Sequence, residues 1–261
     1  MKQIKTLTAL FAVFFLLGIS PQVCASHAMA QLLLAEEGTE CDHSYSYGFC
    51  TLCGEPQADY VVPGTDGYYN LANAHEFLWW SKAVASGTTN ASARLTADID
   101  MEGIAMVPVG ATEQAPFRGT FDGQGHVIRN LELTGENKIG LFSYVTGGAY
   151  VKNFILDSSC SISGGSYVGT IGCTIGNGSV NIEGIGMEGT VTASSVNAGG
   201  ILGCRLDNTA ILMSDCYVTG KVIGGSESAA MAGWVGSGAK ITNLWACGEV
   251  QGPQGDSYPI R

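Results

Sequence analysis

The chain has 261 residues, with 12 Lys and Arg against 23 Asp and Glu, and a formal net charge of −11. Because nucleic-acid phosphates require a basic protein face, this acidity argues against a nucleic-acid partner, and it also argues against electrostatic docking on an anionic membrane. Gly contributes 37 residues and hydrophobic residues make up 46%, a composition that excludes a disordered chain and indicates short strands joined by tight turns.

Residues 1–30 are predicted to be a secretory signal peptide. A basic start at residues 1–5 precedes an apolar run at 7–19, and small residues offer cleavage after Ala25 or Ala30. The run is too short and wrongly flanked for a transmembrane helix. No other stretch of the sequence is apolar enough to span a bilayer. We therefore expect an exported protein, secreted or held at the cell surface.

A leader at residues 31–40 precedes a compact group of Cys and His residues, and together they make a segment of 31–57. The ligand-type residues, spaced C-x-H-x6-C-x2-C, are Cys41, His43, Cys50 and Cys53. A Cys-x2-Cys pair lets two thiolates hold one face of a zinc ion, and the other two residues would complete a tetrahedral Cys₃His set. Four protein ligands leave no open position, so we expect a structural zinc knuckle whose folding energy comes mostly from the metal.

The alternative for this segment is a disulfide, because an exported protein meets an oxidising compartment. Three Cys would leave one of them unpaired, and the fourth group is a His. These two facts favour zinc over a disulfide.

Residues 58–67 are interpreted as a linker, and a repeat domain is predicted over 68–261. Its first element is predicted to be a helix at 74–86, with Asn73 as the N-cap and Glu76 as the acid of a capping box. The apolar residues at helical spacing are Phe77, Leu78, Trp80, Ala83 and Val84. An amphipathic helix before a run of strands is expected to cover the open end of their core.

From residue 128 onward, a short phrase returns five times: apolar residue, any residue, turn-former, apolar residue. The turn-formers are Asn130, Asn153, Gly184, Asp215 and Asn243, residue types that enter left-handed backbone at least cost. The apolar residues that follow them, expected to form one inward column, are Leu131, Phe154, Ile185, Cys216 and Leu244.

The turn-formers are spaced 23, 31, 31 and 28 residues apart, so each unit holds about three short strands. One unit cannot bury its apolar face alone, but stacking units at the sheet spacing of roughly 4.8 Å does bury it. This pattern predicts an all-β fold, a parallel β-helix or solenoid, with an N-terminal capping helix and a small Cys/His knuckle. A β-propeller is the main rival, but its blades need about 40 residues each.

A second apolar pair bounded by Gly recurs in the units. The four quartets are Gly140-Leu141-Phe142-Ser143, Gly169-Thr170-Ile171-Gly172, Gly200-Ile201-Leu202-Gly203 and Gly233-Trp234-Val235-Gly236. They resemble the GLUG-motif family, named for Gly-Leu-hydrophobic-Gly, and depart from its pattern at Ser143, Thr170 and Trp234. The resemblance covers about residues 68–250. It implies a right-handed parallel β-helix in secreted or surface proteins that are adhesin-like or peptidase-associated, and it brings no agreed catalytic residues.

Cys173 and Cys204 both follow the last residue of their quartets. They should therefore lie side by side on adjacent coils. Neighbouring strands are close enough for a disulfide, and a pair of free stacked thiols is the alternative.

Acidic residues raise the alternative of a carbohydrate-active enzyme, a polysaccharide lyase or glycoside hydrolase, because such enzymes use paired carboxylates. The best placed are Asp98, Asp100, Asp122 and Asp157. However, residues 122–125 are first of all a turn, turn and capping roles are commoner for the first two, and His126 stands alone with no basic cluster nearby. The Ser-His-Asp, phosphate-loop and His-Glu-x-x-His patterns are also missing.

The sequence thus favours a protein that is not an enzyme: a secreted or cell-surface binding module, adhesin-like, whose ligand is a glycan or an extracellular or host-matrix protein. Tyrosines that could stack on sugars are Tyr45, Tyr47, Tyr60, Tyr68 and Tyr69. A third hypothesis is a structural stalk, a fragment of a larger adhesin. The sequence stops in mid-coil, and an open strand edge would invite self-association.

Overall fold

The computed structural model describes residues 41–252. The predicted signal peptide and leader lie outside the described residues, as do residues 253–261. The chain divides into two units, and all described residues except 41–44 belong to the second, which begins at Tyr45. Within residues 41–252, none of the helical structure is both long and apolar enough to cross a membrane.

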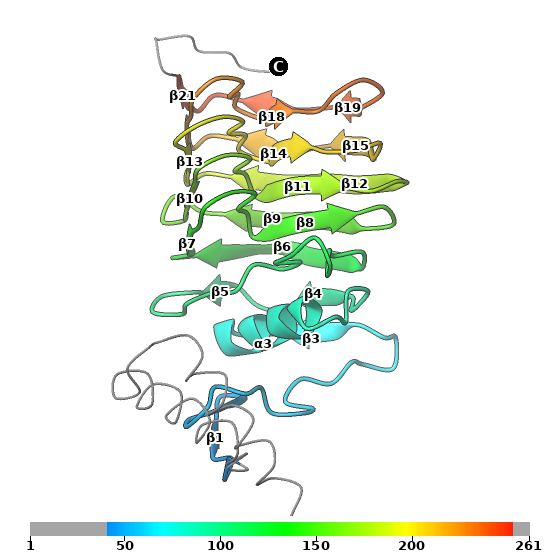
Figure 1. Cartoon of the computed structure of the whole chain (residues 1–261), viewed down its shortest axis with the longest axis vertical. Coiled ribbons are helices and arrows are strands. Elements are labelled where there is room, and N and C mark those ends of the chain that lie inside the picture. The colour runs from blue at the N-terminus through cyan, green and yellow to red at the C-terminus, as the bar shows by residue number, and fades with distance from the viewer. Residues whose placement is uncertain (1–40, 253–261) are drawn as a thin grey trace, which may run out of the picture. The chain divides into compact units, whose positions relative to one another are not determined.

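The second unit is a parallel β-solenoid, which confirms the predicted fold class. Three sheets run along the stack of coils, and each strand pairs with the equivalent strands of neighbouring coils (Figure 1). A β-propeller is excluded, because the pairings within these three sheets are parallel and join residues about one coil apart. The only antiparallel strand pair in the described part of the chain is the small hairpin of β1 (Tyr45–Ser46) and β2 (Phe49–Cys50).

The bounds of the strands follow, in spatial order from the C-terminal end. The five-stranded sheet contains β21 (Glu249–Gln251), β17 (Lys221–Ile223), β13 (Thr190–Ala193), β10 (Ser161–Gly164) and β7 (Glu132–Thr134). The four-stranded sheet contains β18 (Ala232–Trp234), β14 (Leu202–Arg205), β11 (Ile171–Ile175) and β8 (Phe142–Thr146). The path of the ten-stranded sheet contains β19 (Lys240–Thr242), β15 (Ala210–Ser214), β12 (Ser179–Met187), β9 (Tyr150–Leu156), β6 (Thr120–Arg129), β4 (Ala93–Leu95) and β3 (Tyr69–Leu71). Off that path lie β5 (Ile99–Asp100), β16 (Tyr217–Val218) and β20 (Trp245–Ala246).

Apolar rows line the inside of the coils because inward and outward side chains alternate along each strand. The clearest rows are Leu156, Met187 and Val218 in the ten-stranded sheet, and Ile162, Val191 and Val222 in the five-stranded sheet. All six side chains are buried. Burying an aliphatic side chain of this size stabilises the fold by roughly 1.5–3 kcal/mol, so the rows hold successive coils together.

The predicted turn-formers do adopt left-handed backbone. The φ angles are 58° at Asn153, 61° at Gly184, 56° at Asp215 and 50° at Asn243. Asn and Asp tolerate this region better than other non-Gly residues. These left-handed residues lie in the middle of the ten-stranded sheet, and each changes the direction of the chain at the same place in its coil.

Asn130 also has a left-handed φ of 54°, but its predicted place in this column is wrong. Ile128 pairs with Leu156 rather than with Val151, and the Asn130 N–H donates to Ser159 Oγ. The coil partner of Asn153 is instead the irregular stretch between Asp122 and His126. The expected spacing of 23 residues therefore disappears.

The predicted Asp122–Gly125 turn is a bulge inside β6. Asp122 pairs with Lys152 and His126 pairs with Phe154, so three residues of β6 lie opposite one residue of β9. Gln124 and Gly125 take left-handed φ angles of 51° and 80°. The extra residues bend the strand at the corner that a single left-handed residue makes in later coils.

The predicted inward column is confirmed at three of its five positions and differs at two. Phe154 and Ile185 are fully buried register partners, and Cys216 is 1% exposed. Leu131 is buried as well, but its carbonyl accepts from Ser161 N–H, which places it one corner further along the coil. Leu244, in the last described coil, is only half-buried against the core.

The fourth Gly-bounded quartet is displaced by three residues from its predicted position. Leu202 pairs with Ala232, and the N–H of Gly200 donates to the carbonyl of Ala230. The structural quartet is therefore 230–233. Trp234, predicted to be the second residue of the quartet, follows the structural quartet and is 51% exposed.

The helix α3 (Ala74–Ala85) covers the N-terminal end of the core, as predicted. Asn73 Oδ1 accepts from the Glu76 N–H at 3.0 Å, and the Glu76 carboxylate accepts from Ala72 N–H at 2.7 Å. This reciprocal capping fixes the start of the helix. Fully buried Phe77 and Trp80 stack on Phe121 with ring centroids 5.6 and 5.5 Å away.

The inward register predicts the effect of a charge inside the coil. Ile185→Asp places a carboxylate at a position that is 0% exposed, and we expect the free energy of unfolding to fall by at least about 4 kcal/mol. Ser179→Asp, exposed on the same strand β12, is the matched control and should change it by less than about 0.5 kcal/mol. Chemical denaturation measures both, and equal midpoints would contradict the register.

Candidate functional site

The Cys-x2-Cys pair is held by a tight hairpin. Tyr47 and Gly48 connect β1 to β2 with φ angles of 50° and 81°, and two left-handed residues are the geometry that a two-residue hairpin needs. Cys50 Sγ accepts from the Leu52 N–H at 3.4 Å, and the Cys50 carbonyl accepts from Gly54 N–H at 2.9 Å. The backbone after Cys50 therefore folds back over the Cys50 sulfur. This turn is what allows Cys53 to approach Cys50.

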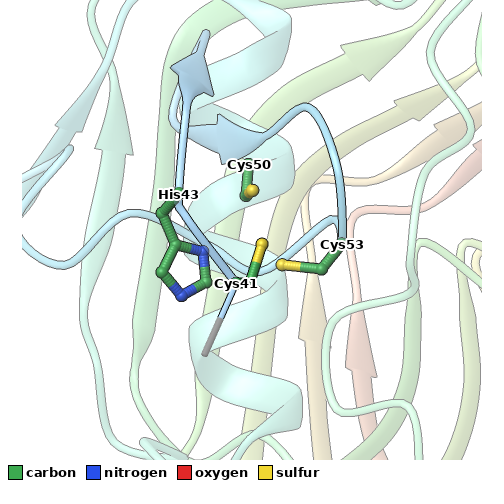
Figure 2. A group of neighbouring side chains, drawn as sticks. All are labelled: Cys41, His43, Cys50 and Cys53. Atoms are coloured by element: carbon green, nitrogen blue, oxygen red, sulfur yellow. The ribbon is translucent and has the colours of Figure 1, made fainter. Parts of the chain in front are cut away.

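The four sequence-predicted ligands come together. The ligand atoms of Cys41, His43, Cys50 and Cys53 all lie within 4.8 Å of one another. Figure 2 shows the three sulfurs and the imidazole gathered around a common space. A zinc–sulfur distance near 2.3 Å implies roughly 3.8 Å between two thiolates of a tetrahedral site. This Cys/His group can therefore hold a metal ion after small side-chain adjustments.

Three contacts hold residues 45–57 against helix α3. Trp79 Nε1 donates to the carbonyl of Gln57 at 2.8 Å, and the rings of Tyr47 and His75 stack with centroids 4.3 Å apart. Lys82 Nζ lies 4.5 Å from the centre of the Phe49 ring. The segment that carries Cys50 and Cys53 is thus anchored on the cap of the solenoid.

The acidic residues weighed as catalytic groups are occupied by structural contacts. Asp98 accepts from the Val127 N–H, from His126 Nδ1 and from Arg129, each at 3.1 Å. These contacts lower the pKa of Asp98, the backbone N–H contributing most, then His126 and then Arg129. The interpretation that His126 stands alone is therefore wrong.

The remaining carboxylates follow the same pattern. Asp100 accepts from Asn130 Nδ2 at 2.8 Å and from the Glu102 N–H, and these bonds lower its pKa in that order of importance. Asp122 lies 3.2 Å from Lys152 Nζ, and Asp157 lies 3.5 Å from Arg129. A glycosidase needs a carboxyl group with a raised pKa as its general acid, and the shifts at Asp98 and Asp100 run in the opposite direction.

An outward aromatic row was missed by the sequence reasoning. Register pairing places five outward residues of the ten-stranded sheet in one line, and they are Val127, Ile155, Gly186, Tyr217 and Trp245. Tyr217 and Trp245 have ring centroids 6.3 Å apart, and Trp245 is 58% exposed. In the later units the sequence does contain a signal for this row. Its members are the residues that directly follow the inward apolar residues Phe154, Ile185, Cys216 and Leu244.

The tyrosines near the start do not form such a row. Tyr47 stacks on His75, Tyr60 covers Gly48, and Tyr69 contacts Trp79 with ring centroids 6.1 Å apart. Tyr68 lies against the Arg94 guanidinium at 5.3 Å. Their contacts are those of local packing.

Comparisons with known proteins do not assign the chain to a family. No protein-family model matches the chain. Over 186 residues, 64% of this chain, the sequence is 28% identical to halomucin from Haloquadratum walsbyi, and it spans only 2% of that protein's length. A crystal structure from Bacteroides ovatus, named “putative immunoglobulin A1 protease”, gives a TM-score of 0.47 at 19% identity, covering 70% of this chain and 69% of that one.

The contacts of Asp98 predict a pH-dependent contribution to stability. Its folded pKa is depressed below the ordinary value of 3.8, so the contribution is present above that value and is lost as pH falls through the folded pKa. Asp98→Asn should lower the melting temperature by a few degrees at neutral pH, and the difference should shrink at a pH below the folded pKa.

The control for this experiment is Glu136→Gln, which removes the same charge from an exposed side chain. Its melting curve should follow that of the unmodified protein across the whole pH range. A constant offset between Asp98→Asn and the unmodified protein down to the lowest pH would contradict the role given to the carboxylate.

Proposed function

We propose that this protein is an exported, non-catalytic binding module of the cell surface or secreted fraction, adhesin-like, and that its ligand is a glycan. The local similarity to halomucin and the β-solenoid fold are compatible with such a module. Membership of the GLUG-motif repeats remains part of the proposal. The observation that carries it is the outward aromatic row, whose aromatic members are Tyr217 and Trp245.

The row runs along the coils with Trp245 exposed, Val127, Ile155 and Tyr217 half-buried, and Gly186 buried. Five residues at a strand spacing of roughly 4.8 Å extend over about 19 Å. At Gly186 a Cβ atom would lie 2.4 Å from the Tyr217 ring, so the ring occupies the space that a side chain at residue 186 would need. Trp245 continues this row on the next coil. Exposed aromatic faces beside polar groups are suited to the apolar faces of sugar rings.

Polar groups beside the row restrict the kind of glycan. Tyr217 Oη donates to the Glu188 carboxylate at 2.7 Å, and burial followed by this hydrogen bond raises the pKa of Tyr217 to about 12. The hydroxyl therefore stays protonated at neutral pH. The Glu188 carboxylate makes the neighbourhood of Tyr217 negative, so an uncharged or amino-sugar glycan fits better than an acidic one.

Glycan binding is tested with the two exposed tryptophans. Trp245→Ala should weaken binding to uncharged or amino-sugar glycans by about tenfold or more, the loss expected when an aromatic anchor is removed. Trp234→Ala is the matched control, because Trp234 is 51% exposed but lies on the four-stranded sheet. A glycan array followed by titration calorimetry gives the affinities.

Two results would overturn the glycan proposal. One is the absence of binding by the unmodified protein to every glycan on the array. The other is equal affinity of the two tryptophan variants and the unmodified protein for a glycan that does bind.

We also propose that the Cys/His group binds zinc in a structural role. The spacing, the approach of all four ligand atoms and the Leu52 N–H bond to Cys50 Sγ support this assignment, since a backbone N–H stabilises a thiolate ligand. The anchoring contacts on α3 then let the ion fix the hairpin at the capped end of the solenoid.

Purified protein should contain about one zinc ion per chain by elemental analysis. Cys53→Ser should lose the metal, and proteolysis should then cut within 41–57 while the solenoid stays intact. Cys247→Ser, which alters an exposed Cys outside the group, should keep the zinc. A protein without zinc that carries a disulfide among Cys41, Cys50 and Cys53 would contradict this assignment.

A further inference from the structure

Cys173 and Cys204 form a buried pair between two coils. They are direct register partners on β11 and β14, and they are 0% and 1% exposed. Their sulfur atoms lie 2.8 Å apart. Register partners in adjacent strands have the Cα separation that disulfides require, so no backbone movement is needed to bond them.

The pair lies outside the hydrophobic core cluster of the coils. Along its own row, Tyr144 precedes it and Trp234 follows it. Gly172 and Gly203, one residue before each Cys, have no room for a side chain, because a Cβ there would lie 2.6 to 2.7 Å from neighbouring backbone atoms. These glycines therefore pack closely against neighbouring backbone beside the two sulfurs.

We propose that Cys173 and Cys204 form a disulfide that covalently joins two successive coils of the exported protein. This inference depends on the proposed export, because a disulfide persists in an oxidising compartment and not in a reducing one. It is independent of the glycan and of the zinc, since neither involves these residues.

The chemistry is a thiol–disulfide exchange with a disulfide-donating oxidant of the secretory compartment. One thiol loses its proton, and its thiolate attacks the oxidant's disulfide to give a mixed disulfide. The second thiolate then displaces the oxidant's remaining sulfur. Two protons and two electrons leave the protein, one S–S bond forms, and the oxidant is released as a dithiol.

The bond must form before the coils close. Burial, and then the hydrogen bond to Cys204, raise the pKa of the Cys173 thiol, so the folded pair offers little thiolate to an oxidant. In the unfolded chain both thiols are accessible to the oxidant. Once formed, the bond is shielded from reductants by the same burial.

A bond at this place opposes fraying of the stack. In a solenoid each coil contacts only its neighbours, so stability is close to a sum of coil-to-coil interfaces. β14 lies between β11 and the last strand of its sheet, β18. Joining β11 to β14 prevents the last coils from separating at that interface.

The test uses the full chain, refolded in a glutathione redox buffer so that export is not a variable. Free thiols are blocked at low pH, and the unreduced protein is cleaved after Glu. Glu183 and Glu188 lie between the two cysteines, so peptides 137–183 and 189–227 separate unless a disulfide links them. We expect the linked pair, lighter by two hydrogen atoms than the sum of its reduced peptides.

Variants assign the bond and measure its effect. The same two peptides also contain Cys160 and Cys216, so the link between them must be assigned to particular cysteines. The double variant Cys160→Ala/Cys216→Ala should keep the link, and Cys173→Ser should abolish it. Reduction should lower the melting temperature of the unmodified protein by on the order of 10 °C, and it should have no effect on Cys173→Ser/Cys204→Ser.

Separate peptides carrying blocked Cys173 and Cys204 would overturn the proposal. The link could also form in the redox buffer but be missing from protein recovered outside the cell. That result would contradict the proposed export through an oxidising compartment and would leave the pairing of the two cysteines intact. The two results therefore separate the disulfide from the proposed localisation.

Discussion

The whole structure depends on apolar side chains that stack in register inside the coils. Each coil is too thin to bury its own apolar face, so Phe154 and Ile185 become buried only because one lies on the other. The gain is repeated at every interface between coils. Helix α3 ends the stack on one side by placing Phe77 and Trp80 on the last exposed rings.

Because the interior is filled by these rows, the chemistry of the protein lies outside it. The outward residues of the ten-stranded sheet form the aromatic row of Tyr217 and Trp245, and the Cys/His group lies in the segment before the cap. The carboxylates at Asp98 and Asp122 are paired with cations. A regular outer surface with aromatic residues and neutralised carboxylates suits recognition better than catalysis.

Local patterns were predictable, and register was not. The capping box at Asn73, the Cys/His spacing and the left-handed turn-formers depend on residues close in sequence, so the sequence alone identifies them. The phrase at Ile128 matches the repeat locally but belongs to a different corner, because the bulge after Asp122 adds residues to that coil. The row of Tyr217 and Trp245 is harder to find from the sequence, since its members are separated by whole coils and come together only when the repeat units are aligned column by column.

Cysteine cross-linking measures this register most directly. Thr192 and Ile223 are register partners on β13 and β17, so Thr192→Cys/Ile223→Cys should form a disulfide under mild oxidation. Thr192→Cys/Lys221→Cys, offset by two residues on the same face, should not, because its Cα atoms lie more than about 7 Å apart. Equal cross-linking of the two pairs, or efficient cross-linking of the offset pair alone, would contradict the stacked arrangement.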